Sequence, residues 1–383
     1  MANSDEPDPS TADHSTSAVA PPAVPSKPAA LSNQRKPRSR LRRAIKWLVL
    51  LLLTLVVALV VFVMWASGGV TNDDAVAKSE LIVLDPEADP PALTDTFGVM
   101  AFNIGYGRGP EGDYAGPWER AHIERHLDGI AAQIESSGVH IAALQEVDFD
   151  SARTHGIHEG RYLAEKLGFN WLSCTRTWEK NYVPFPYWPP SRHYGRMSSG
   201  QCLLSRFPIQ SAVRYRQPQP EGNPFWKNLF YLNRAIDHIE VDVGGTTLHV
   251  FNVHLEAFSI ENRMHQVNSL RGLLNGLSAK HAIALGDFNA LPSGTAKTRG
   301  FEDEPEADFT GDQTMARADT MVDMREVLAG VDPLTFPAHA ATRRLDYIYY
   351  RTTGIEPVSA SVLDAQPPWS DHLPVMATLR LRP

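Results

Sequence analysis

The sequence predicts one transmembrane helix followed by a single α/β domain of two packed sheets flanked by helices. An uncharged apolar run of about twenty residues, 47–66, predicts the helix. From residue 96 onward, short apolar runs typical of buried strands recur along the chain, and only a few segments between them show helical spacing. Many strands with few intervening helices indicate sheets that pack on each other and are covered by helices.

The first segment, residues 1–46, is a polar tail that ends in a basic run. Residues 1–34 are rich in Pro, Ala, Ser and Thr and nearly lack large apolar side chains, so we expect them to be disordered. Seven Lys and Arg side chains follow between Arg35 and Lys46, immediately before the apolar run. This position favours a role in membrane topology and contact with anionic lipids over nucleic-acid binding.

The apolar run itself has the features of a membrane anchor. Trp47 and Trp65 bracket it, and it lacks the polar face of a helix packed on a soluble core. A cleaved signal peptide has a shorter apolar part behind a shorter N-terminal region, so an uncleaved anchor in the bilayer is the preferred interpretation. Because the cations precede the run, the positive-inside rule predicts a single-pass protein with a cytoplasmic N-terminus and a periplasmic or extracellular domain.

The charge of the chain is divided unevenly. Residues 1–46 contain eight Lys and Arg and four Asp and Glu, which gives them a net charge of +4. Because the whole chain has a net charge of −8, residues 47–383 have a net charge of −12. Proteins that bind nucleic acid non-specifically usually have a basic surface, so this balance disfavours a DNA or RNA substrate. No protein partner is inferred.

Residues 67–95, with two glycines and three prolines, predict a linker, and the folded domain is expected over 96–383. We predict strands over 97–102, 140–144, 200–209, 235–241, 247–252, 281–285, 345–350 and 375–381. We predict helices over 118–136, 161–167, 261–277 and 324–328, and a surface loop over 293–320.

Two aromatic segments and two cysteines leave alternatives open. The segments 171–194 and 225–231 are either loop aromatics packed on the domain, or a substrate wall or membrane-contacting lip beside the site. Cys174 and Cys202 form either a disulfide, which an exported domain allows, or two separate buried thiols.

Polar residues recur where the predicted strands end. Strands of one sheet present their ends along a common edge, so these side chains can converge there. The set is Asn103, Glu146, His254, Asp287, Asn289, Asp371 and His372, with Asp346 inside a strand.

Asp287 and Asn289 follow the buried strand 281–285 after Gly286, which permits a tight turn. In extended backbone they would project to the same side, where a carboxylate and an amide suit a hard metal ion and its phosphate oxygens. The alternative for this pair alone is a strand end with an Asx turn.

With these residues in place, the chain resembles the endonuclease/exonuclease/phosphatase superfamily. This superfamily includes deoxyribonuclease I-like enzymes, abasic-site endonucleases, inositol polyphosphate 5-phosphatases and neutral sphingomyelinases. The resemblance covers about residues 96–383 and implies a four-layered α/β/β/α sandwich with two central mixed sheets. The motifs occur in the family order at 102–103, 144–147, 204–209, 252–255, 286–289, 345–348 and 370–372.

The resemblance implies a role for each polar residue. Glu146 would be the main ligand of Mg²⁺, or of Mn²⁺ in its place, assisted by Asn103, and Asp371 would contribute directly or through water. Asp346 would orient His372, which would act either as a general base or as a charged phosphate ligand.

In the second version of the mechanism, Asp287 activates the attacking water instead. His254 and Asn289 would donate hydrogen bonds to phosphoryl oxygens. The implied reaction is in-line hydrolysis of a phosphoester by water.

The sequence departs from the family patterns at two places, and the second departure disfavours an inositol polyphosphate as the substrate. Val253 replaces the usual Thr before His254, and Leu285 and Ala290 flank the Gly-Asp-Phe-Asn stretch where inositol phosphatases have a longer motif. We therefore expect a membrane-anchored, metal-dependent phosphoesterase that acts on a phosphodiester or phosphomonoester other than an inositol polyphosphate. The alternatives are an extracellular nuclease and a non-catalytic binding module on the same fold.

Overall fold

The computed structural model describes residues 38–69, 74–92, 95–110, 116–331, 333–364 and 366–383. The predicted disordered tail, 1–34, lies outside these residues. The chain divides into two compact units, Met1–Ala58 and Leu59–Pro383.

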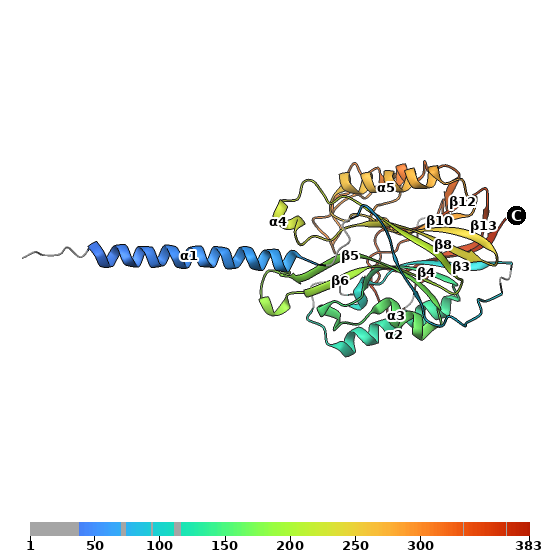
Figure 1. Cartoon of the computed structure of the whole chain (residues 1–383). Helices are drawn as coiled ribbons and strands as arrows, with labels where there is room; N and C mark the ends of the chain where they lie inside the picture. The colour runs from blue at the N-terminus through green and yellow to red at the C-terminus, as the bar shows by residue number, and fades with distance from the viewer. Residues whose placement is uncertain (1–37, 70–73, 93–94, 111–115, 332, 365) are drawn as a thin grey trace, which may run out of the picture. The chain divides into compact units, whose positions relative to one another are not determined.

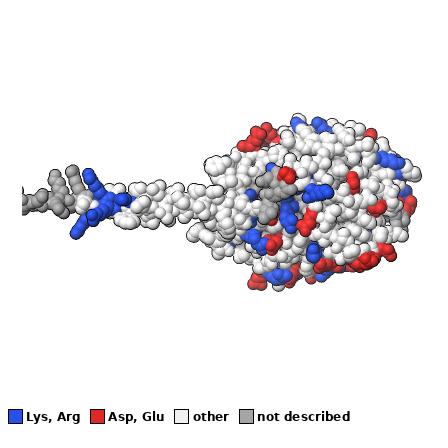
Figure 2. All heavy atoms as spheres, viewed as in Figure 1, with Lys and Arg blue, Asp and Glu red and all other residues white. Residues whose placement is uncertain are grey.

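Helix α1, Arg38–Ser67, contains the predicted membrane anchor (Figure 1). Its segment Ser39–Ser67 has 29 residues and includes an 18-residue window with a mean hydropathy of 3.2, and by length and composition it could cross a membrane. Large apolar side chains such as Trp47 and Met64 are exposed along it. Figure 2 shows that the described cations of the basic run gather at the N-terminal end of this helix.

Two mixed sheets of seven strands each form the centre of the second unit over the described residues. The first sheet has the order β1-β7-β8-β9-β10-β12-β11, and the second has the order β13-β14-β3-β4-β6-β5-β2. Only β9 with β10 and β3 with β4 pair in parallel among the described strands. The strands of the first sheet are β1 Val76–Lys78, β7 Ile209–Arg216, β8 Ala235–Val243, β9 Thr246–His254, β10 Ala282–Asp287, β11 Met324–Glu326 and β12 Asp346–Arg351. Those of the second sheet are β2 Glu80–Val83, β3 Phe97–Asn103, β4 Ile141–Asp148, β5 Trp171–Val183, β6 Gly195–Ser205, β13 Ile355–Val362 and β14 Val375–Leu381.

Helices cover the outer faces of both sheets. Figure 1 shows α5, Ile260–Gly276, on one side of the sheets, and α2, Arg120–Ser137, with α3, Glu159–Leu167, on the other. The short helices α4, Phe225–Asn228, and α6, Thr314–Ala318, lie in the connections of the chain.

The apolar pattern of strand β3 explains this layering. Val99 and Ala101 lie in the core between the two sheets, whereas Met100 and Phe102 lie in the core under α2 and α3. Because successive side chains point to opposite faces, a strand buried on both sides reads as a continuous apolar run. A third core lies between the first sheet and α5. The predicted four-layered sandwich with two mixed sheets is confirmed.

The predicted linker, 67–95, is wrong in part. β1 pairs with β7 and β2 pairs with β5, so this segment adds one edge strand to each sheet. Both strands are mostly exposed, and backbone hydrogen bonds to their neighbours hold them in place. In β2 the side chain of Ile82 packs on the core under α2 and α3, but strands of three or four residues are too short for their apolar pattern to identify them in the sequence.

Other local predictions also need correction. Residues 324–328 were predicted to form a helix, but β11 begins there and pairs with β12. Met324 and Glu326 are buried and Arg325 is exposed, a strand alternation too short to be distinguished from helical spacing. The predicted loop 293–320 contains α6 and a small buried cluster with Phe301 and Phe309.

The first half of the aromatic segment 171–194 is strand β5 and not a loop. Cys174 of β5 faces Cys202 of β6 in register, with a Cα–Cα distance of 4.2 Å, and the two cysteines form a disulfide. A Cβ at Gly160 of α3 would lie 2.8 Å from the Cys202 sulfur. The disulfide is therefore buried directly beneath this helix.

Replacing either of two helical glycines by alanine should change the free energy of unfolding, but in opposite directions. A Cβ at Gly129 of α2 would lie 2.0 Å from the Trp369 ring, whereas nothing lies within 4 Å of a Cβ at Gly272 of α5. We expect Gly129→Ala to lower the free energy of unfolding by about 1–3 kcal/mol through overpacking. Gly272→Ala should raise it by about 0.5–1 kcal/mol through helix propensity. Urea denaturation of both variants measures this, and a Gly129→Ala protein as stable as wild type would contradict the packing.

Candidate active site

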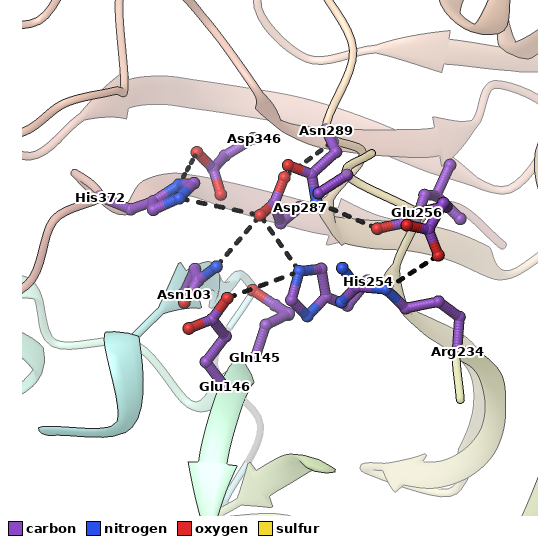
Figure 3. A network of polar contacts seen from close by, with 12 residues as sticks. Asn103, Gln145, Glu146, Arg234, His254, Glu256, Asp287, Asn289, Asp346 and His372 are labelled. Atoms are coloured by element: carbon purple, nitrogen blue, oxygen red, sulfur yellow. Dashed lines mark hydrogen bonds and ion pairs between the residues drawn. The ribbon is translucent and has the colours of Figure 1, made fainter. Parts of the chain in front are cut away.

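The predicted polar residues come together at one edge of the sandwich. Strands β3 and β10 end at Asn103 and Asp287, and β9 ends at His254. In the register of the first sheet, Asp287 is the partner of both His254 and Asp346. Both parallel pairs therefore direct their carboxyl ends to the same place, which lies between the two sheets (Figure 3).

Gly286 allows β9 and β10 to approach each other at this edge. Its φ is +139°, and a Cβ there would lie 2.0 Å from the carbonyl oxygen of Val253. Only glycine fits this contact without a shift of the backbone.

Asp287 occupies the centre of the site. Its Oδ2 accepts a hydrogen bond from Asn103 Nδ2 at 3.0 Å, and it lies 3.5 Å from His254 Nε2 and 3.8 Å from His372 Nε2. Burial raises the pKa of Asp287 to about 6, assisted by Asp346 and opposed by His372 and by the hydrogen bonds from Asn289 and Asn103. The carboxylate is therefore mostly ionised at neutral pH and poised close to the pH range where it can take up a proton.

His372 and Asp346 form a buried pair. His372 Nδ1 lies 2.9 Å from Asp346 Oδ2. Burial lowers the pKa of His372, but Asp346 and Asp287 outweigh this effect and raise the pKa to about 10. The imidazole is therefore a cation at neutral pH, which suits it to hold negative charge and not to act as a base.

His254 has the opposite character. Burial, Arg234 and His372 lower the pKa of His254 well below its usual value, so the ring is neutral. Its Nε2 lies 3.8 Å from Glu146 Oε1 in addition to its contact with Asp287. A neutral imidazole in this place can donate one hydrogen bond without adding charge.

Asn289 does not lie in extended backbone as the sequence suggested. Its φ is +49°, and its backbone N–H donates to Asp287 Oδ1 at 2.8 Å, which is an Asx turn. Its side-chain amide donates to the carbonyl of Leu255 at 3.0 Å. The turn fixes both Asp287 and Asn289 beside the site, and the amide keeps a second N–H.

Asn103, Glu146 and Asp371 form a set of oxygen ligands. Glu146 has a φ of +53° at a register shift of β4, and such bulges often redirect side chains at active sites. Asn103 Oδ1 accepts from the backbone N–H of Gly105, and a Cβ at Gly105 would lie 2.8 Å from Asp371 Oδ1. Asn103 and Asp371 therefore share one neighbour.

The charges of this set suit a cation. Burial and the nearby carboxylate of Asp371 raise the pKa of Glu146. Two carboxylates that repel each other beside an amide oxygen are the type of ligand that Mg²⁺ prefers, and a bound cation would relieve the repulsion. Arg108, with Nη2 at 3.6 Å from Glu146 Oε2, offsets part of the charge.

A second combination of residues, Asp287, Asp346 and His372, has potential ligand atoms within 4.8 Å of one another. A protonated imidazole has no lone pair for a metal, so the cationic state of His372 disfavours this combination relative to the oxygens of Glu146, Asn103 and Asp371.

Four buried residues around the site are not among those that the sequence predicts, and they form two pairs. Gln145 donates to Asn252 Oδ1 at 2.8 Å across the two sheets, and Arg234 Nε lies 4.0 Å from Glu256 Oε2 beside His254 (Figure 3). Arg234 precedes the first residue of β8, which is antiparallel to β9. The starts of antiparallel strands, and not only the ends of apolar runs, would have identified it.

The fold and site define a known class of enzyme. A model of the Endonuclease/Exonuclease/phosphatase family matches residues 100–372, so the chain belongs to this family. Members of the family are hydrolases that act on phosphoester bonds.

Individual relatives are distant. The chain is 27% identical over 226 residues to sphingomyelin phosphodiesterase 2 of Rattus norvegicus, which covers 50% of each protein, so it spans about half the length of this curated relative. An endonuclease/exonuclease/phosphatase from Beutenbergia cavernae has a TM-score of 0.52 at 22% identity, covering 75% of this chain and 72% of the other. The mannosyl-6-phosphatase Bt3783 of Bacteroides thetaiotaomicron has a TM-score of 0.50 at 16% identity, covering 74% and 99%. At these identities the two structures show the fold alone.

Proposed function

We propose that this protein is a membrane-anchored, Mg²⁺-dependent phosphodiesterase that hydrolyses a sphingomyelin-type or other phospholipid headgroup. The position of Asp287 between a cationic and a neutral histidine, beside a set of oxygen ligands, carries the proposal of hydrolysis. The named relative and the apolar parts of the surface support the lipid.

Glu146, Asn103 and Asp371 would hold the metal ion. When bound, Mg²⁺ would polarise the scissile phosphate and offset the charge on the leaving oxygen. Mn²⁺ offers the same chemistry to these oxygen ligands.

Asp287 orients the attacking water and accepts its proton. Asn103 and the backbone of Asn289 hold one oxygen each of this carboxylate, so its lone pairs have a fixed direction. His372 can act as a cationic donor to a phosphoryl oxygen, because Asp346 keeps its Nδ1 side occupied and its Nε2 faces Asp287. Between the two versions left open by the sequence, this distribution of protons favours Asp287 as the base.

The two remaining groups stabilise the transition state. His254 is neutral and close to both Glu146 and Asp287, and Asn289 has a second N–H. Each can donate to a phosphoryl oxygen whose charge grows as water attacks in line.

Removal of the proposed base should abolish most of the activity. We expect Asp287→Asn to lower kcat on a chromogenic phosphodiester by about 100-fold or more, since general base catalysis contributes roughly 10²–10⁴-fold. His372→Ala should lower kcat by about 100–1000-fold, because the variant loses one charged hydrogen-bond donor. EDTA should stop the wild-type reaction and added Mg²⁺ should restore it.

Asp364→Asn is the matched control, because Asp364 is exposed. Equal rates for wild type, Asp287→Asn and His372→Ala would exclude the proposed chemistry and would favour a binding module.

The membrane anchor rests on helix α1. Its uncharged apolar run, residues 47–66, matches the roughly 20 residues that span a bilayer, and the basic run before it favours a cytoplasmic N-terminus. A reporter that functions only outside the cytoplasm, fused after Pro383, tests this orientation. A signal from a cytoplasmic reporter at the same position would reverse it.

Exposed aromatic side chains in segments that hydrogen bonds link to Glu256 support a lipid substrate. Glu256 beside the site accepts a hydrogen bond from Tyr231 Oη at 2.5 Å, and the backbone N–H of Phe258 donates to the same oxygen. Trp178 of β5 donates to the carbonyl of Phe230 at 2.9 Å, which joins the two aromatic segments. The large side chains that these segments expose are Tyr187 at 77%, Trp188 at 81%, Phe225 at 75% and Trp226 at 61%, and Phe258, which follows Glu256 by two residues, is 76% exposed.

The aromatic side chains should matter only when the substrate lies in a bilayer. We expect the double variant Trp188→Ala/Trp226→Ala to hydrolyse sphingomyelin in vesicles at least about tenfold more slowly, because interfacial aromatics bind at the headgroup level. Its rate on a soluble chromogenic phosphodiester should not change.

The control replaces exposed Tyr187 by Phe, which keeps the ring.

A panel with plasmid DNA, RNA, phosphatidylcholine and a sugar phosphate covers the nuclease and phosphomonoesterase alternatives. Faster hydrolysis of DNA, RNA or the monoester would overturn the lipid assignment but leave the active site intact.

A further inference from the structure

A second cluster of possible metal ligands lies on strands β8 and β9. Glu240 and His249 are direct partners across these antiparallel strands, and His238 precedes Glu240 by two residues. The neighbours Ile239, Val241, Leu248 and Val250 all face the core between the sheets. His238, Glu240 and His249 therefore share the outer face of the first sheet.

The three side chains already converge. His238 Nε2 lies 2.9 Å from His249 Nδ1, and His249 Nδ1 lies 3.7 Å from Glu240 Oε1. One potential ligand atom of each residue lies within 4.8 Å of the others. Ser211 Oγ donates to the second carboxylate oxygen, Oε2, at 2.9 Å and leaves Oε1 directed toward the histidines.

Stacking fixes the His238 ring, and burial lowers the pKa of both histidines. His238 stacks on Phe251 with ring centroids 4.5 Å apart and an interplanar angle of 1°. Burial and His249 lower the pKa of His238, and burial, Arg351 and His281 lower the pKa of His249 although Glu240 opposes this. Neutral imidazoles have the free lone pair that a metal ligand needs.

We propose that His238, Glu240 and His249 bind a transition-metal ion of the Zn²⁺ class, with water at the fourth position. Two imidazoles and one carboxylate are a ligand set that zinc accepts. Mg²⁺ prefers oxygen ligands only, so this set differs in selectivity from Glu146, Asn103 and Asp371.

The geometry needs only a small adjustment. Zn–N bonds of about 2.0 Å in a tetrahedral site place two ligand atoms roughly 3.3 Å apart, compared with 2.9 and 3.7 Å in the structure. The Glu240 side chain is 34% exposed and that of His249 13%, so an ion can enter from solvent. Ser211 would orient the carboxylate, as residues behind metal ligands commonly do.

The proposed ion would connect β8, which begins directly after Arg234, with β9, which ends at His254 in the active site. His249 and His254 lie five residues apart on β9, which corresponds to roughly 16 Å along a strand. The site is therefore separate from the catalytic residues. Metal binding should stabilise the β8–β9 pair without replacing Mg²⁺.

The experiment is a titration of the purified full chain with Zn²⁺, and in parallel with Co²⁺, in excess Mg²⁺. Calorimetry gives the affinity, and the visible absorption of Co²⁺ reports nitrogen coordination. We expect one site that His238→Gln and His249→Gln each weaken by at least about tenfold, since even indirect support of a ligand contributes about 10–100-fold. Glu240→Gln, a change at a more exposed position, should also weaken it.

His265→Gln is the matched control, because His265 is exposed on α5. Unchanged phosphoesterase rates in the three site variants verify that they fold, and Zn²⁺ should raise the Tm of wild type and of His265→Gln only. The proposal is overturned if wild type binds no Zn²⁺ in excess Mg²⁺, or if the site variants bind it as wild type does. It is also overturned if His265→Gln loses binding to the same extent.

Discussion

The hydrogen bond from Asn103 Nδ2 to Asp287 Oδ2 joins the two sheets at the edge where the active site lies. Both residues are only 1% exposed, and a buried carboxylate without donors is costly, so this contact fixes how the sheets meet. The hydrogen bond from Gln145 to Asn252 is a second buried link between the two sheets. Together the two contacts hold the ends of β3 and β4 against those of β9 and β10. Every reactive group is positioned relative to them.

The balance of charge in this small volume explains what the site can do. Asp346 and Asp287 keep His372 protonated, whereas Arg234 and His372 keep His254 neutral. Burial and Asp371 raise the pKa of Glu146, so a cation bound beside these two carboxylates would be stabilised. Family membership connects this arrangement with phosphoester hydrolysis. The substrate is a separate question, because these buried groups act on the phosphoester and do not select the rest of the molecule.

Sequence patterns and structure agree where residues are buried and differ where they are not. The apolar runs at 97–102 and 281–285 became central strands, because burial on both faces requires them to be apolar throughout. β1 and β2 fall in the predicted linker and β11 in a predicted helix, because three or four residues are too few for a side-chain pattern to distinguish a strand from other structures. Aromatic residues within β5 were assigned to a loop because interleaved polar residues and the prolines that follow obscured the strand.

The sequence by itself determined the family, the two-sheet sandwich, the apolar helix and the eight polar residues that come to the site edge. It did so because strand ends and short motifs are local features of the chain. Only the tertiary structure decided which groups are charged, since the protonation of His254, Asp287 and His372 depends on neighbours from other strands and on burial. The same holds for the Cys174–Cys202 disulfide, for Arg234 and Glu256, and for the cluster of His238, Glu240 and His249. Each of these requires side chains distant in sequence to meet, and separation along the chain does not set that distance.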